Sequence, residues 1–85
     1  MANPKSRLRV ARNFIQRYGA DRFERLLEAF ARGESGQAIA DEFNVSRERV
    51  RQWKNTFGQV VTIYQVHSEV RDVLDETQGV LYLGH

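Results

Sequence analysis

One stretch of the chain, residues 35–57, constrains the fold more than any other. Its sequence, SGQAIADEFNVSRERVRQWKNTF, places apolar residues three and four positions apart, which predicts two helices. Asn44 separates them, and asparagine tolerates the left-handed conformation that a tight turn between helices needs. Ser35 and Ser46 stand where N-caps are expected. The stretch therefore predicts a short helix, a tight turn and a second helix over residues 46–57.

The apolar residues of this stretch satisfy the steric needs of a helix-turn-helix, in which two helices cross closely and the second keeps one face free. A small residue must lie at the crossing, and Ala40 occupies that position. Apolar residues must hold the crossing from both helices. The predicted core of the unit is Ile39, Ala40, Phe43, Val45, Val50 and Trp53.

The remainder of the chain also favours helices. Residues 6–18 and 21–32 each carry apolar residues at helical spacing and end before a glycine. Residues 59–77 contain VVTIYQV, which has the composition of a strand, but its 3–4 spacing continues to Leu74 and strict alternation is missing. We therefore expect a helix there. The fold class is an all-α bundle of four to five helices.

This pattern divides the chain into three parts. Residues 1–58 form a helical core that contains the helix-turn-helix at 35–57, residues 59–77 form a C-terminal helix, and residues 78–85 are a tail without a predicted conformation. Residues 1–57 hold twelve Lys or Arg against seven Asp or Glu, whereas residues 58–85 hold one Arg against four acids. A basic core suits a polyanion, and the acidic segment suggests a different partner.

Composition argues against several other classes of protein. The 85 residues include no cysteine, so no disulfide and no thiolate metal site can form. No Ser–His–carboxylate set or glycine-rich phosphate loop occurs at a readable spacing, so we expect no enzyme and no cofactor. His67 and His85 have no ligand partners at a suitable spacing, so we expect no metal. No apolar run approaches the length of a spanning helix and the first residues lack the hydrophobic stretch of a signal peptide, so we expect neither. We expect a cytoplasmic, nucleoid-associated protein that does not contact membranes.

The outer face of residues 46–57 is polar and charged. Positions 47, 48, 51 and 52 share that face, opposite the predicted core. Arginine can form two hydrogen bonds to guanine, glutamine two to adenine, and glutamate can accept one from cytosine. The residues expected to contact bases in double-stranded DNA are Arg47, Glu48, Arg51 and Gln52. The residues expected to contact the DNA backbone are Gln37, Ser46, Arg49, Lys54 and Asn55.

Two alternatives remain open for these charges. Glu48 complements the helix dipole whether or not it contacts a base, and it could instead hold a neighbouring arginine. The arginines at positions 7, 9, 12 and 17 could form a phosphate-binding face, although such residues are more often ordinary helix surface.

Residues 45–52, VSRERVRQ, resemble the recognition helix of region 4 of bacterial sigma-70 factors, where VTRERIRQ reads the −35 promoter element. The resemblance covers residues 35–57 and implies that Arg47, Glu48, Arg51 and Gln52 lie at or near bases. The next residues, Trp53-Lys54, depart from that family and are more similar to helix-turn-helix proteins of phages and mobile elements. The resemblance also makes RNA polymerase, or another protein of the transcription machinery, a candidate partner.

We therefore expect a bacterial or phage transcriptional regulator that binds specific DNA sequences. A homodimer is expected, because two linked half-sites multiply affinity and specificity. The alternative is a protein-interaction or accessory module of a transcription, recombination or packaging complex. In either case the apolar face of the predicted C-terminal helix is the candidate interface. Its residues are Val60, Ile63, Tyr64, Val66, His67, Val70, Val73 and Leu74.

Overall fold

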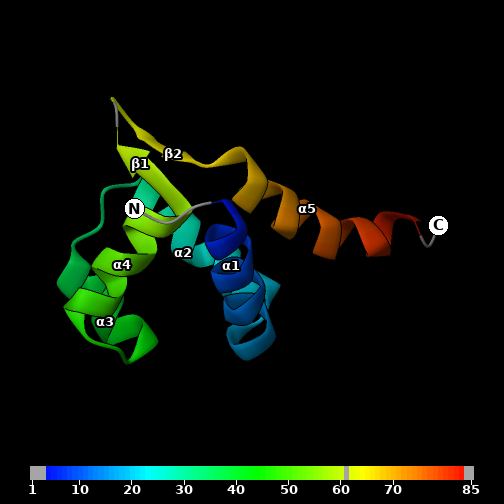
Figure 1. Ribbon diagram of the computed structural model, residues 1–85. Coiled ribbons are helices and arrows are strands. Elements are labelled where there is room, and N and C mark those ends of the chain that lie inside the picture. The colour runs from blue at the N-terminus through cyan, green and yellow to red at the C-terminus, as the bar shows by residue number, and fades with distance from the viewer. Residues whose placement is uncertain (1–3, 61, 84–85) are drawn as a thin grey trace.

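The computed structural model describes residues 4–60 and 62–83, and within them it contains five helices and one two-stranded hairpin (Figure 1). The helices are α1 (Pro4–Tyr18), α2 (Ala20–Ala31), α3 (Gly36–Phe43), α4 (Arg47–Phe57) and α5 (Ser68–Leu83). The strands are β1 (Gly58–Val60) and β2 (Tyr64–Val66). The prediction of a small, mostly helical bundle is confirmed.

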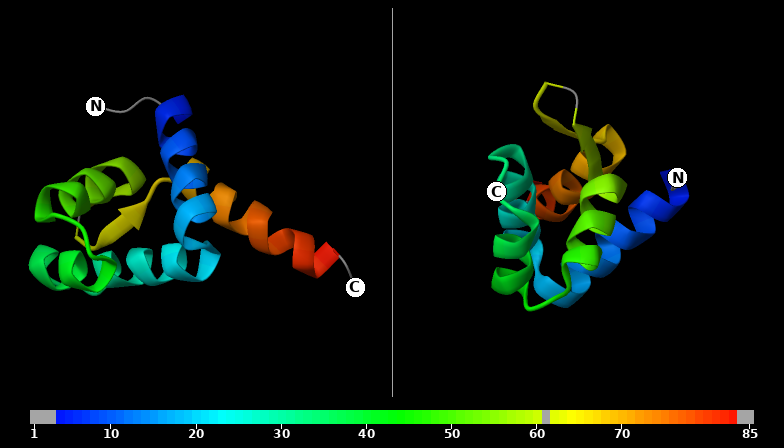
Figure 2. Two further views of the ribbon diagram at one scale, coloured as in Figure 1. Left: turned by 90° about the horizontal axis from the view of Figure 1, so that it is seen from below. Right: turned by 90° about the vertical axis from the view of Figure 1, so that its left-hand side faces the viewer.

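Helix α1 is the centre of the bundle, because α2, α4 and α5 all pack against it (Figure 2). Its buried residues Ala11 and Phe14 are the inner part of the stripe that the sequence predicts. Gly19 separates α1 from α2 with a φ of 95°, a backbone conformation that residues other than glycine rarely adopt. The chain can therefore turn sharply between α1 and α2, so that the two helices share one core.

That core is rich in aromatic rings. Phe14 lies 5.3 Å from Phe23, 5.0 Å from Trp53 and 6.1 Å from Phe57, measured between ring centroids. Its contacts with Trp53 and Phe57 are edge-to-face, the arrangement that the charge distribution of aromatic rings favours. Phe14 thus connects α1 to both α2 and α4.

The prediction of one helix over residues 59–77 is wrong. Strands β1 and β2 pair in antiparallel register, with Gly58 opposite Val66 and Val60 opposite Tyr64, and α5 begins only at Ser68. The β-branched composition of VVTIYQV therefore outweighs its helical spacing here. The tail that had no predicted conformation continues α5 as far as Leu83, while residues 84–85 lie outside the described residues.

The hairpin is held by contacts that sequence periodicity does not reveal. The Tyr64 hydroxyl donates a hydrogen bond to the Lys54 carbonyl at 2.7 Å, and the His67 backbone N–H donates to the Phe57 carbonyl at 2.8 Å. Both carbonyls belong to the last turn of α4, where helical carbonyls lack partners within the helix. Burial raises the pKa of the Tyr64 hydroxyl above its ordinary value, so this donor stays protonated. The hairpin therefore closes the end of α4.

The expected apolar interface on residues 60–74 does not exist as one helical face. Tyr64, Val70, Val73 and Leu74 are buried in the chain's own core, and Val66 and His67 are half-buried. Only Val60 and Ile63 of that set are largely exposed, at 60% and 66%. A partner that bound this segment would therefore meet the hairpin, not a stripe along α5.

The acidic C-terminal segment pairs with α1. Arg7 forms an ion pair with Glu69, and Arg12 forms a more exposed one with Glu76 at 3.4 Å. These contacts hold the first turns of α5 against α1, whereas its C-terminal end extends away from the other helices (Figures 1 and 2). Part of the charge asymmetry between the two halves thus serves the fold itself.

Among the described residues, no helix is long and apolar enough to cross a membrane.

We predict that Gly58→Ala destabilises the fold. A Cβ at this position would clash with the Gln65 carbonyl oxygen, which is backbone and cannot move without disturbing the strand pairing. The expected loss is about 1–3 kcal/mol in the free energy of unfolding, measured by urea denaturation.

Gly36→Ala is the matched control, because a Cβ there meets nothing within 4 Å. We expect it to be neutral or stabilising by less than about 1 kcal/mol. Equal stability of the Gly58→Ala and Gly36→Ala variants would contradict the close approach of β2 to residue 58.

Candidate DNA-binding surface

The turn between α3 and α4 has the geometry that the sequence predicts. Asn44 adopts the left-handed conformation, with φ 57° and ψ 49°, and is the only non-glycine residue with positive φ in the described part of the chain. The Val45 backbone N–H then donates to the Ala40 carbonyl at 3.0 Å, which closes the turn. The conformation of a single residue therefore sets the angle between the two helices.

Both helices of the unit begin at a serine cap. The Ser35 hydroxyl accepts a hydrogen bond from the Ala38 N–H, and the Ser46 hydroxyl accepts one from the Arg49 N–H, each at 3.1 Å. The two predicted caps are confirmed. Each satisfies an N–H that has no partner within its own helix.

The inner sides of α3 and α4 pack together and onto α1. Five of the six predicted core residues are buried, and the sixth, Val45, is half-buried beneath the turn. Trp53 is 6% exposed, and its ring packs against Phe14 and Phe43. The position of α4 is thus fixed along its inner side.

The outer side of α4 is exposed throughout. Arg47, Glu48, Arg51 and Gln52 all lie on it, turned away from the buried Val50 and Trp53. The four residues for which we predict base contacts therefore share one face of a rigidly supported helix. Asn55 is also exposed, one turn beyond Arg51.

Two members of this face bind each other. The Arg51 guanidinium donates to both Glu48 carboxylate oxygens, from Nη2 at 2.6 Å and from Nε at 3.2 Å. This contact holds the pKa of the Glu48 carboxyl below its ordinary value, so the carboxyl stays ionised at neutral pH. In the free protein, Glu48 therefore orients Arg51, which is the alternative left open by the sequence.

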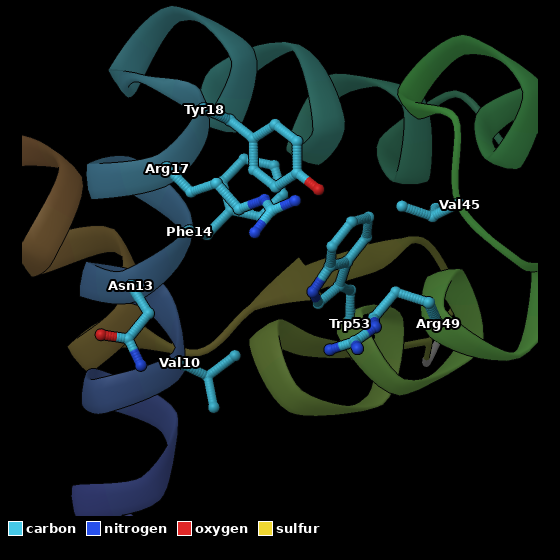
Figure 3. Close-up of a pocket in the computed structure, with 8 residues that line it drawn as sticks. All are labelled: Val10, Asn13, Phe14, Arg17, Tyr18, Val45, Arg49 and Trp53. Carbon is cyan, nitrogen blue, oxygen red and sulfur yellow. The ribbon is translucent and has the colours of Figure 1, made fainter.

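The flanks of α4 carry the basic residues expected to contact backbone. Arg49 is exposed on the flank near α1, where it lines a groove shared with that helix (Figure 3). Lys54 is half-buried on the opposite flank, in a hollow that Ser35 and Gln37 also line. The Gln37 amide donates to the Asp41 carboxylate at 2.8 Å, so it is engaged within α3.

Sequence reasoning missed the residue that anchors α3 to α2. The Arg25 guanidinium forms ion pairs with Glu34, before α3, at 3.0 Å and with Glu42, near its end, at 2.8 Å. Hydrogen bonds from Arg25 also hold the pKa of the Glu34 carboxyl below its ordinary value. No local pattern could reveal this network, because its members lie nine and seventeen positions apart.

The structure separates the four arginines that might have formed one phosphate-binding face on α1. Arg7 and Arg12 are paired with carboxylates of α5. Arg9 and Arg17 are exposed, and Arg17 lines the groove beside Arg49.

Within the described residues, no three His, Cys, Asp or Glu side chains gather as a metal site would require. His85 lies outside those residues.

A comparison with known protein families supports this geometry. Residues 24–60 match the family model of a helix-turn-helix domain, a span that begins within α2 and ends with β1. No curated protein and no solved structure matches the chain. The match is to the helix-turn-helix domain in general, and the narrower resemblance to region 4 of sigma-70 factors is not supported by it. Residues 24–60 are therefore similar to a helix-turn-helix domain, and the helix–turn–helix geometry of α3 and α4 agrees with that similarity.

Proposed function

We propose that the protein is a transcriptional regulator that binds specific double-stranded DNA sequences and inserts its recognition helix, residues 46–57, into the major groove. The exposed face of Arg47, Glu48, Arg51 and Gln52 carries this proposal. It lies on a helix whose opposite side is buried and whose two ends are fixed by Ser46 and by the hairpin. A rigid helix can present side chains to base edges in a fixed register.

The chemistry of that face suits base recognition. Arg47 and Arg51 each offer a planar pair of donors that fits the O6 and N7 atoms of guanine, and Gln52 can pair with adenine. The Glu48–Arg51 contact implies an exchange on binding. Arg51 would release one or both carboxylate oxygens when it meets guanine, and Glu48 would then be free to accept from a neighbouring cytosine.

The hairpin favours contact with a protein. Residues 58–66 contain no charged side chain, and Val60 and Ile63 are exposed near its tip. Such a surface has little attraction for phosphates but can pack against another apolar surface. A second copy of this chain is the partner we propose, because a dimer would place two recognition helices on half-sites about 10 base pairs apart.

The same hairpin is the observation that favours the alternative function. An accessory module of a transcription, recombination or packaging complex would use it to bind RNA polymerase or another protein of the machinery. Binding through an apolar hairpin would respond little to salt, whereas DNA binding weakens steeply as salt rises, because condensed counterions are released.

We predict that Arg51→Ala and Lys54→Ala affect DNA binding differently. Arg51→Ala removes a base contact, so it should cost about 1–3 kcal/mol on the preferred site and relax the base preference there. Lys54→Ala removes a phosphate contact, so it should weaken binding to every sequence alike and lower the salt slope by about one. Fluorescence anisotropy with a preferred and a scrambled duplex measures both effects.

Equal losses on the preferred and the scrambled duplex for Arg51→Ala would count against direct reading of bases by this face.

We predict that the protein sediments as a dimer and that replacing Val60 and Ile63 by serine shifts it to monomer. Both side chains are exposed, so the change should alter the free energy of unfolding by less than about 1 kcal/mol. Sedimentation of a wild-type monomer at all accessible concentrations would reject the dimer and leave the hairpin to another partner.

A further inference from the structure

The arginines of α1 fall on two sides of the helix, and only one side is neutralised by the chain itself. Arg7 and Arg12 meet the carboxylates of α5. Arg17 lies on the side that faces α4, where it lines the groove together with Arg49 (Figure 3). Within residues 4–60 and 62–83, neither Arg17 nor Arg49 forms an ion pair with a carboxylate.

The groove itself is apolar at its floor and basic at its rim. Val10, Phe14, Val45 and Trp53 contribute apolar surface from α1, the turn and α4. The remaining lining residues include Asn13 and the two arginines, and no acidic residue lines the groove. Two arginines thus line one concave surface to which the protein contributes no acidic residue, and such a surface is complementary to a bound anion.

The position of the groove relative to α4 identifies the anion. At 100° per residue, Arg49 and Lys54 lie on opposite flanks of the exposed face that holds Arg47 and Arg51. A helix in the major groove has one DNA strand on each side, because the groove is only about 12 Å wide. With α4 in the major groove as proposed above, the flank of Arg49 would face the backbone of one strand, and the flank of Lys54 would face the other.

We infer that Arg17 and Arg49 form a phosphate clamp that grips the DNA strand beside α1, with Asn13 as an additional amide donor. This inference rests on the proposed function, and it assigns one of the four α1 arginines, Arg17, to the same DNA strand as Arg49. The clamp would fix the rotation of α4 about its own axis. Lys54 and the N-terminal end of α3 hold the opposite strand.

The clamp is partly organised before DNA arrives. The guanidinium of Arg17 lies 5.5 Å from the centre of the Tyr18 ring, within the range of a cation–π contact. The Tyr18 ring in turn packs on Phe14 at 4.6 Å and on Trp53 at 6.0 Å, so its position follows that of the aromatic core. Arg49 lies one helical turn before Trp53 on α4, so the packing of Trp53 in the aromatic core also sets the position of the Arg49 backbone.

The test compares Arg17→Gln and Arg49→Gln with Arg12→Gln, a matched control that removes the same charge from the other side of α1. Binding of each full-length variant to a 25-base-pair random-sequence duplex is measured across a range of salt concentrations. We expect Arg17→Gln and Arg49→Gln each to lower the salt slope by up to about one, because each weakens the grip on the phosphate that the two residues share. Arg12→Gln should leave the slope unchanged. Arg17→Lys should retain the wild-type slope because the charge is kept.

A double-mutant cycle then tests whether the two arginines share a phosphate. The Arg17→Gln/Arg49→Gln variant should lose less affinity than the two single losses combined, because either loss already weakens the grip of the other residue. The Arg17→Gln/Lys54→Gln variant changes residues on opposite flanks of α4. Its loss of binding free energy should equal the sum of the two single losses.

The outcomes separate this inference from the function on which it rests. Wild-type protein that does not bind the duplex would overturn both. A second outcome would overturn the clamp alone. In it the wild-type protein binds and Lys54→Gln lowers the salt slope, but Arg17→Gln has the same slope as the control Arg12→Gln. Additive losses for Arg17→Gln and Arg49→Gln would also overturn it, because the two residues would then act on separate phosphates.

Discussion

The packing of Phe14 against Trp53 is the interaction on which the rest of the structure depends. The two rings meet edge-to-face at 5.0 Å, and Phe14 also reaches rings of α2, α3 and α4. Trp53 belongs to the inner side of the helix whose outer side carries the proposed base contacts. Because Trp53 packs on α1, the position of α1 determines where α4 lies and thus where Arg51 and Gln52 are held. Loss of this contact would leave the same side chains exposed, but α4 would no longer hold them in a fixed position relative to the rest of the protein.

The C-terminal end of α4 is fixed by a second constraint, the return of the chain through the hairpin. Tyr64 hydrogen-bonds to the last turn of α4 and packs on Phe30 of α2 at 5.1 Å. Gly58 makes this return possible, because its missing side chain admits the Gln65 carbonyl and the Tyr64 ring. Helix α4 is thus supported at both ends and along one side, which leaves its polar face as the part available to a ligand.

Much of this could be predicted from the sequence, and the part that could not has a physical reason. The left-handed Asn44, the caps at Ser35 and Ser46 and the core of α3 and α4 are local features, so spacing alone reveals them. The sequence predicts a helix where the hairpin lies, because this valine-rich segment has apolar residues at helical spacing and lacks the strict alternation typical of a strand. The pairing of Arg12 with Glu76 and the presence of Arg17 and Arg49 in one groove depend on how distant helices pack, which no local pattern records.

The most direct test of the central claim is the selection of binding sites from a random duplex library by the wild-type protein. The account predicts an enriched motif that contains guanines, with dyad symmetry if the protein binds as a dimer. An asymmetric motif like a −35 element would favour a monomer that acts beside RNA polymerase. No enrichment, with only weak and salt-sensitive binding, would contradict reading of bases by α4.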